Sequence, residues 1–161
     1  MRGWATVAML TAVVLAACAP PSDVGDTQPT TDATPRCAET LTPATGPVEP
    51  AAGAPEIGEL TAAWVCVYSI GEEWTLAEGP AAIEDLDGVR ALVDTLEPAD
   101  LNQACTMELG PEYVLHLVED QRHLRIVIDD YGCRWARMGD SSEILTGSDS
   151  FLADLTALAG L

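Results

Sequence analysis

Two histidines, a pair of adjacent aspartates and five cysteines are the side chains of this chain best suited to chemistry. His116 or His123 could act as a general base in hydrolysis, and Asp129-Asp130 could act as a carboxylate pair. Both histidines fall on the polar face of one predicted hairpin, which is typical of solvated surface imidazoles. Adjacent strand residues point to opposite sides of a sheet, so the two aspartates would not share a cleft. Without a G-x-S-x-G motif or a phosphate-binding glycine loop, the sequence predicts no catalytic residues and no cofactor.

Two patterns raise the question of a metal ion. Residues 84–88, Glu-Asp-Leu-Asp-Gly, have the carboxylates of a calcium loop but lack the third spaced ligand and the terminal glutamate. The acids are better explained as the start of a helix, where the helix dipole favours negative charge. The four cysteines after residue 18 show neither C-x-x-C nor the cysteine–histidine spacing of a zinc site. We therefore expect no metal site.

The motif Leu15-Ala16-Ala17-Cys18 closes a leader that has one positive charge, at Arg2, and then a mostly apolar stretch. Such a leader is typical of a removed export signal, because a membrane span needs about 20 apolar residues. The motif resembles the lipobox of bacterial lipoproteins, whose cysteine receives a diacylglycerol and becomes the new N-terminus. The resemblance implies a signal peptide at 1–17 and a protein anchored through acylated Cys18 to the lipid bilayer, on the extracytoplasmic face of the cell membrane. The alternative is an ordinary cleaved signal with an incidental cysteine.

Residues 18–55 hold eight of the eleven prolines and almost no large apolar side chain. Such a segment buries too little surface to offset its chain entropy, so we expect a tether there. Residues 56–161 remain, a length suited to a single globular domain. The chain has no lysine, and removal of the leader would leave six arginines against 26 carboxylates, a formal charge of −20. This charge disfavours nucleic acid as a partner and favours a basic or cationic partner in the cell envelope.

Residue periodicity predicts six strands, at residues 62–70, 73–78, 113–119, 123–129, 133–138 and 142–146. It also predicts two helices, one between Pro80 and Pro98 and one that ends the chain with Ser148 as a plausible N-cap. The order ββ-α-ββββ-α indicates an α+β fold, in which an antiparallel sheet of about five to six strands carries helices on one face.

The two predicted hairpins also have predicted registers. In the first, Gly71-Glu72 forms the turn, and one face carries Val65, Val67, Trp74 and Leu76. In the second, Asp120 and Gln121 form the turn, and an apolar face pairs Leu117 with Leu124, Leu115 with Ile126 and Tyr113 with Ile128. Its other face is polar and carries His116, His123, Arg125 and Asp129.

The four remaining cysteines are an even number, which in a small exported domain indicates two disulfides. Three pairings are possible. Cys105 lies six residues before Pro111 and Cys133 four residues after Asp129, so the second hairpin places both at its open end. We therefore expect Cys105–Cys133 and, by elimination, Cys37–Cys66. Each bridge would close a loop of about 28 residues and contribute about 3–4 kcal/mol.

Two stretches, CTMELGPEYVLHL (105–117) and DYGCRW (130–135), resemble parts of small, uncharacterised lipoproteins of high-GC Gram-positive bacteria. The resemblance supports the membrane location and the pairing of Cys105 with Cys133, and it implies no activity. The sequence therefore predicts a lipid-anchored, acidic module of the envelope that has a binding or structural role without catalysis. A small-ligand carrier is the alternative and would need a pocket between sheet and helix. A hydrolase that uses His116 or His123 is a further alternative.

Overall fold

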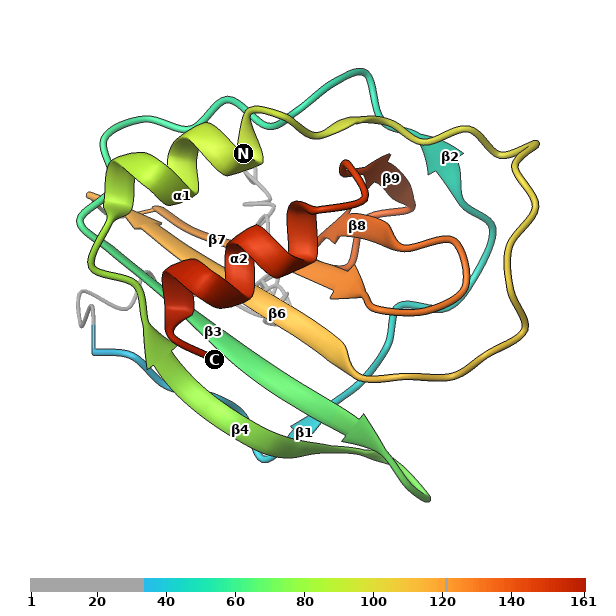
Figure 1. Ribbon diagram of the computed structural model, residues 1–161, viewed down its shortest axis with the longest axis horizontal. Coiled ribbons are helices and arrows are strands. Elements are labelled where there is room, and N and C mark those ends of the chain that lie inside the picture. Colours follow the sequence, from blue (N-terminus) through green and yellow to red (C-terminus); the bar gives the residue numbers. More distant parts are fainter. Residues whose placement is uncertain (1–33, 121) are drawn as a thin grey trace, which may run out of the picture.

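The computed structural model describes residues 34–120 and 122–161, which form a β-sheet with two helices on the same side of it (Figure 1). The strands are β1 (Thr40–Leu41), β2 (Glu49–Pro50), β3 (Ala62–Ile70), β4 (Trp74–Ala82), β5 (Glu97–Pro98), β6 (Glu112–Glu119), β7 (Arg122–Asp129), β8 (Trp135–Met138) and β9 (Glu143–Thr146). The helices are α1 (Leu86–Val93) and α2 (Phe151–Ala159). Neighbouring strands follow the order β1-β4-β3-β6-β7-β8-β9-β2, and β5 also pairs with β9.

The predicted leader, Cys18 and the tether up to residue 33 lie outside the described residues. Within residues 34–120 and 122–161, no helix is long and apolar enough to cross a membrane.

The prediction of a wholly antiparallel sheet with five to six strands is wrong in strand number and direction. The six expected strands are present as β3, β4 and β6 to β9, but β1, β2 and β5 join them. Each of these three has two residues, too few to show the alternation by which a strand is recognised in a sequence. β2 runs parallel to β9, so the sheet is mixed. The two predicted helices are present, and both cover one face.

Ordered structure begins well before residue 56, where the sequence places the start of the domain. Both β1 and β2 lie within 34–55, in the proline-rich segment that we expected to be a tether. The disulfide between Cys37 and Cys66 fastens this segment to β3, and Leu41 is buried. Composition is misleading here because the segment gains its order from contacts with the sheet and not from a core of its own.

The first hairpin, β3–β4, differs from its predicted register. Ile70 pairs with Trp74, so the loop holds residues 71–73 and is one residue longer than expected. Because side chains alternate along a strand, one extra loop residue moves all the side chains of a strand to the other face. Val65 therefore packs beneath the helices, whereas Trp74 and its neighbour Leu76 lie on the opposite face.

The second hairpin, β6–β7, has the predicted register. Leu117 pairs with Leu124, and the pairing continues without a shift from one end of the hairpin to the other. Gln121, half of the expected turn, lies outside the described residues. Beside the turn, Arg122 Nε donates to Glu119 at 2.9 Å. The strict alternation of apolar and polar residues in the two strands, joined by a short loop, was enough to predict this hairpin.

Both helices are shorter than the patterns that predict them. Pro80 lies in β4, and α1 begins only at Leu86, where the Asp85 side chain accepts a hydrogen bond from the Gly88 N–H at 2.9 Å. The acidic residues of this region thus begin a helix, as expected. For α2 the N-cap is Ser150 and not Ser148, and its side chain makes no capping hydrogen bond.

The sheet has an apolar cluster on each face. The cluster under the helices joins strand residues to both helices and includes Val65, Leu115, Ile126, Val89 and Leu155, all 0% exposed. The other cluster is smaller and aromatic, and its buried residues are Leu41, Trp64, Cys66, Tyr68, Trp74, Val114 and Val118. We call this second side the helix-free face. It also carries the polar half of the β6–β7 hairpin.

Candidate functional site

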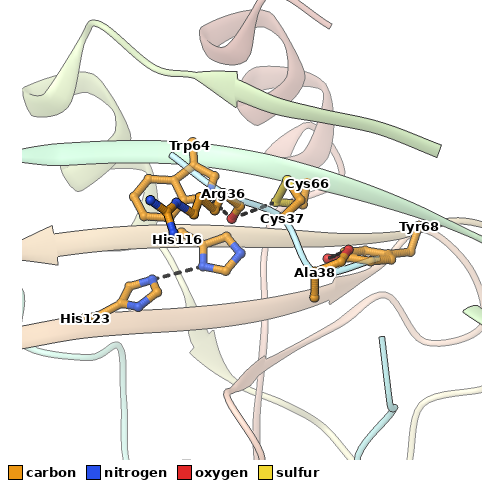
Figure 2. The surroundings of a disulfide bond; sticks show 8 residues. All are labelled: Arg36, Cys37, Ala38, Trp64, Cys66, Tyr68, His116 and His123. Carbon is orange, nitrogen blue, oxygen red and sulfur yellow. Dashed lines mark hydrogen bonds between the residues drawn. A yellow bond between two sulfur atoms is a disulfide. The ribbon is translucent and has the colours of Figure 1, made fainter. Parts of the chain in front are cut away.

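Residues 36–44, here called the N-terminal segment, lie across the helix-free face. At β3, the Arg36 carbonyl accepts a hydrogen bond from Trp64 Nε1 at 2.9 Å, and the Ala38 carbonyl accepts one from the Tyr68 hydroxyl at 3.1 Å (Figure 2). At β8, the Ala44 carbonyl accepts a hydrogen bond from Arg137 at 2.9 Å. The segment thus spans from β3 to β8 and covers polar residues that would otherwise face solvent.

Two cavities lie between the N-terminal segment and the sheet. The histidine cavity, about 240 Å³, is lined by Ala38, Thr40, Leu41, Thr42, Tyr68, Val114, His116, Arg125 and Asp140. The carboxylate cavity, about 180 Å³, is lined by Thr42, Pro43, Ala44, Glu112, Val127, Asp129, Tyr131, Trp135, Arg137, Gly139 and Asp140. Thr42 and Asp140 line both, so the two cavities are neighbours.

The two histidines are in contact with each other and with Trp64. His116 Nδ1 lies 3.0 Å from His123 Nε2, and the His116 ring stacks on the indole of Trp64 with centroids 4.8 Å apart (Figure 2). The expectation that both imidazoles are solvated is wrong for His116, which is only 9% exposed. The sequence could not show this, because Trp64 comes from a different hairpin.

Burial, and to a lesser extent the nearby His123 and Arg125, lower the pKa of His116 from 6.5 to about 3. The pKa of His123 is also lowered, first by burial and then by Arg125. His116 is therefore neutral at pH 7, and its Nε2 is buried without a hydrogen-bond partner among residues 34–120 and 122–161. Neither histidine bonds to a serine or a carboxylate within the described residues. The pair lacks the oriented nucleophile and base of a hydrolase.

Two carboxyl groups meet in the second cavity. Glu112 and Asp129 lie directly opposite each other in the β6–β7 register, so their side chains are neighbours on the helix-free face. Glu112 is 4% exposed, and its Oε1 accepts a hydrogen bond from the Tyr131 hydroxyl at 2.9 Å. The Tyr131 ring stacks on Trp74, with centroids 5.9 Å apart, which holds the hydroxyl in place.

Both carboxyl groups have raised pKa values. Burial raises the pKa of Glu112, against the opposing effects of the Tyr131 hydrogen bond and the Arg137 charge. Burial and then the charge of Glu112 raise the pKa of Asp129 to about 6, again opposed by Arg137. Perturbed carboxyl groups beside a cavity are typical of functional sites. This cavity is therefore our candidate binding site.

A third cavity lies on the other side of the sheet, beside α2. It has a volume of about 410 Å³ and is lined by residues of β7, β8 and α2, among them Ile128, Ala136 and Phe151. Asp129, Asp130 and Arg134 also line it. The expectation that the adjacent residues Asp129 and Asp130 would not share a cleft is therefore wrong, because both line this cavity.

The structure contains two disulfide bonds, between Cys37 and Cys66 and between Cys105 and Cys133. These are the two pairs expected from the sequence. No group of three or more histidine, cysteine or acidic side chains in residues 34–120 and 122–161 is placed to hold a metal ion.

Sequence reasoning missed the most unusual residues of the site: Glu112, Tyr131, Trp135 and Arg137. A signal existed for Glu112, because the register that pairs Tyr113 with Ile128 also pairs Glu112 with Asp129. No local signal identifies the others, which come from β8 and from the loop before it.

Comparisons with protein-family models, with curated proteins and with solved structures found no match.

Proposed function

We propose that the protein is a lipoprotein anchored by Cys18 to the outer side of the cell membrane, and that its acidic domain binds a basic partner of the envelope without catalysis. The lipobox of the sequence supports the anchor. Two disulfides support a location outside the cytoplasm, where such bonds persist. The observation that carries the binding role is the helix-free face, where carboxyl groups line a cavity beneath the N-terminal segment.

The charge distribution supports a basic partner. Three ion pairs join side chains within residues 34–120 and 122–161, and they use Arg90, Arg122 and Arg125. The chain has 26 acidic residues and seven basic ones, so most carboxylates have no arginine available. Such an excess of negative charge accelerates the association with a basic surface and makes it sensitive to salt.

The geometry favours binding over hydrolysis. No serine or carboxylate of the described residues bonds to the histidine pair, and Glu112 is almost completely buried. The carboxylate cavity of about 180 Å³ is smaller than the roughly 300–1,000 Å³ typical of sites that enclose a whole ligand.

The anchor is tested by replacing the cysteine of the lipobox. Cys18→Ala should move the protein from the membrane fraction to the soluble fraction, because the lipid is attached to the Cys18 sulfur. Ala19→Ser, which keeps the cysteine, is the matched control and should remain with the membrane. A Cys18→Ala protein that stays bound as firmly as the control would contradict the anchor.

The partner is tested by carbodiimide crosslinking in intact cells. This reagent joins carboxylates to amines, and because the chain has no lysine, its carboxylates can react with lysines of a partner but not with its own. We expect capture of a basic protein, with a yield that falls steeply as salt is raised. Capture of nothing, or capture that is insensitive to salt, would refute the basic partner.

The cavity beside α2 favours a second candidate, a small-ligand carrier. Its volume of about 410 Å³ lies within the range of ligand pockets, and it lies between sheet and helix. Native mass spectrometry of the protein extracted from its own membrane should then show a bound small molecule. Ala153→Trp, which would fill this cavity, should remove the molecule, and a spectrum without any bound mass would reject the carrier.

A further inference from the structure

Two residues that line the carboxylate cavity each have a buried polar atom that the described residues leave without a partner. One is Glu112 Oε2, an acceptor, on a side chain that is 4% exposed. The other is Trp135 Nε1, whose N–H is a donor. Buried polar groups in proteins nearly always have a hydrogen-bond partner, so two unpartnered groups in one small cavity point to a group supplied from outside.

The acceptor side of the cavity is negatively charged. Glu112 and Asp129 lie opposite each other there, and the third carboxylate of the lining, Asp140, is already paired with Arg125 at 2.6 Å. Arg137 is the one arginine of the lining, and no ion pair within the described residues joins it to Glu112 or Asp129. A group that binds at this side must therefore donate hydrogen bonds, and a positive charge on it is favourable.

The donor side of the cavity has the opposite preference. Trp135 Nε1 can only donate, and the Arg137 guanidinium has N–H groups besides the one that bonds to the Ala44 carbonyl. A group that binds here must accept hydrogen bonds. Since both sides line one cavity of about 180 Å³, the cation and the acceptor must lie within a few bonds of each other.

We propose that the carboxylate cavity binds a primary ammonium group that has a carbonyl or carboxylate oxygen next to it, the chemistry of an α-amino acid or of a peptide N-terminus. The ammonium group donates to Glu112 and Asp129. The neighbouring oxygen accepts from Trp135 Nε1 and Arg137. This site goes beyond the proposed binding of a basic partner, because it recognises a small group and not a charged surface.

Titration calorimetry with four small probes tests the two sides separately. The protein is the complete chain, extracted in a non-ionic detergent that brings no charged group. Glycinamide carries both groups, ethylamine carries only the ammonium, acetamide carries only the carbonyl, and triglycine presents the same groups at a peptide N-terminus. We expect glycinamide to bind at least about tenfold more tightly than ethylamine or acetamide. Triglycine that binds like glycinamide identifies a peptide terminus as the source, and triglycine that fails identifies a free amino acid or amide.

Two conservative variants each remove one side of the site. Glu112→Gln keeps the acceptor for the Tyr131 hydroxyl but removes the negative charge. It should therefore weaken the binding of both glycinamide and ethylamine about tenfold. Trp135→Phe keeps an aromatic ring but removes the N–H. It should therefore weaken the binding of glycinamide and leave the binding of ethylamine unchanged. Glu78→Gln, at an exposed position of β4, is the control and should bind like the parent.

Three results would overturn the proposal. They are no heat of binding for glycinamide at millimolar concentration, equal affinities for glycinamide and ethylamine, or a loss of binding of both probes in Trp135→Phe. Thermal unfolding of each variant guards against misfolding, and Asp129→Asn provides a second variant for the acceptor side. Salt-sensitive crosslinking to a basic protein that persists in Glu112→Gln would leave the proposed function intact even if the amino-acid site fails.

Discussion

Asp129 should make the protein less stable at neutral pH than at acidic pH. Burial and the charge of Glu112 raise its pKa from 3.8 to about 6, with Arg137 opposing. A carboxyl group whose pKa is higher in the folded state holds its proton more tightly there. Its contribution to stability is fully present below pH 3.8 and is lost as the pH rises through about 6.

The size of the effect follows from the shift. About two pKa units correspond to about 3 kcal/mol at roughly 1.4 kcal/mol per unit. Because the side chain is partly exposed, we reduce this value for solvent screening to about 2 kcal/mol. Asn cannot ionise. When the pH is raised from 4 to 7.5, the free energy of unfolding of Asp129→Asn should therefore rise by about 2 kcal/mol relative to that of the parent protein.

Urea denaturation followed by tryptophan fluorescence at a series of pH values measures this difference. The test uses how the difference in unfolding free energy between variant and parent changes with pH. Any effect of the amide that is the same at every pH then cancels. Glu112→Gln should reduce the pH dependence of the parent, because it removes a charge that raises the pKa of Asp129. The reasoning would be refuted if the unfolding free energy of Asp129→Asn, relative to the parent, did not change with pH or fell as the pH rises.

Three further predictions concern the core, a glycine and the histidine pair. Leu155→Ala should cost about 2–5 kcal/mol in urea denaturation, because Leu155 is 0% exposed between α2 and the sheet, and a cost under 1 kcal/mol would contradict this packing. Gly79→Ala should destabilise by about 2 kcal/mol or more, since Gly79 has φ +107° and a Cβ would lie 2.6 Å from the Val65 carbonyl oxygen; Gly53→Ala, with nothing within 4 Å, is the control and should be near neutral. The pKa of His116 is lowered from 6.5 to about 3, so its contribution to stability should be full above pH 6.5 and be lost as the pH drops toward 3. NMR should therefore show a neutral His116 ring at pH 5, and a ring that titrates near 6.5 would exclude burial.

The parts of the fold that were predictable from the sequence depend on local patterns. The β6–β7 register followed from the strict alternation of residues 113–129, because the two strands are joined by a short loop. The same register predicted the pairing of Cys105 with Cys133. The acids at 84–87 predicted the start of α1, where Asp85 caps the helix.

The first hairpin shows how a small local error becomes a large one. The loop of β3–β4 is one residue longer than predicted, and the register shifts again at Val65 and Val67. Because side chains alternate with a period of two, this single residue decides whether Trp74 faces the helices or the opposite side. Gly71-Glu72 is compatible with either loop length, so composition alone did not distinguish them.

The sequence by itself determined the acidic charge, the even number of cysteines, the two helices and the six longer strands, since each depends on composition or on neighbours close along the chain. Only the tertiary structure decided which polar groups are buried. Glu112 and His116 occupy the polar face of a hairpin, and that face would be solvated if the N-terminal segment did not cross it. Burial and the pKa shifts it causes depend on contacts between residues far apart in the sequence, and no periodicity within a strand contains that information.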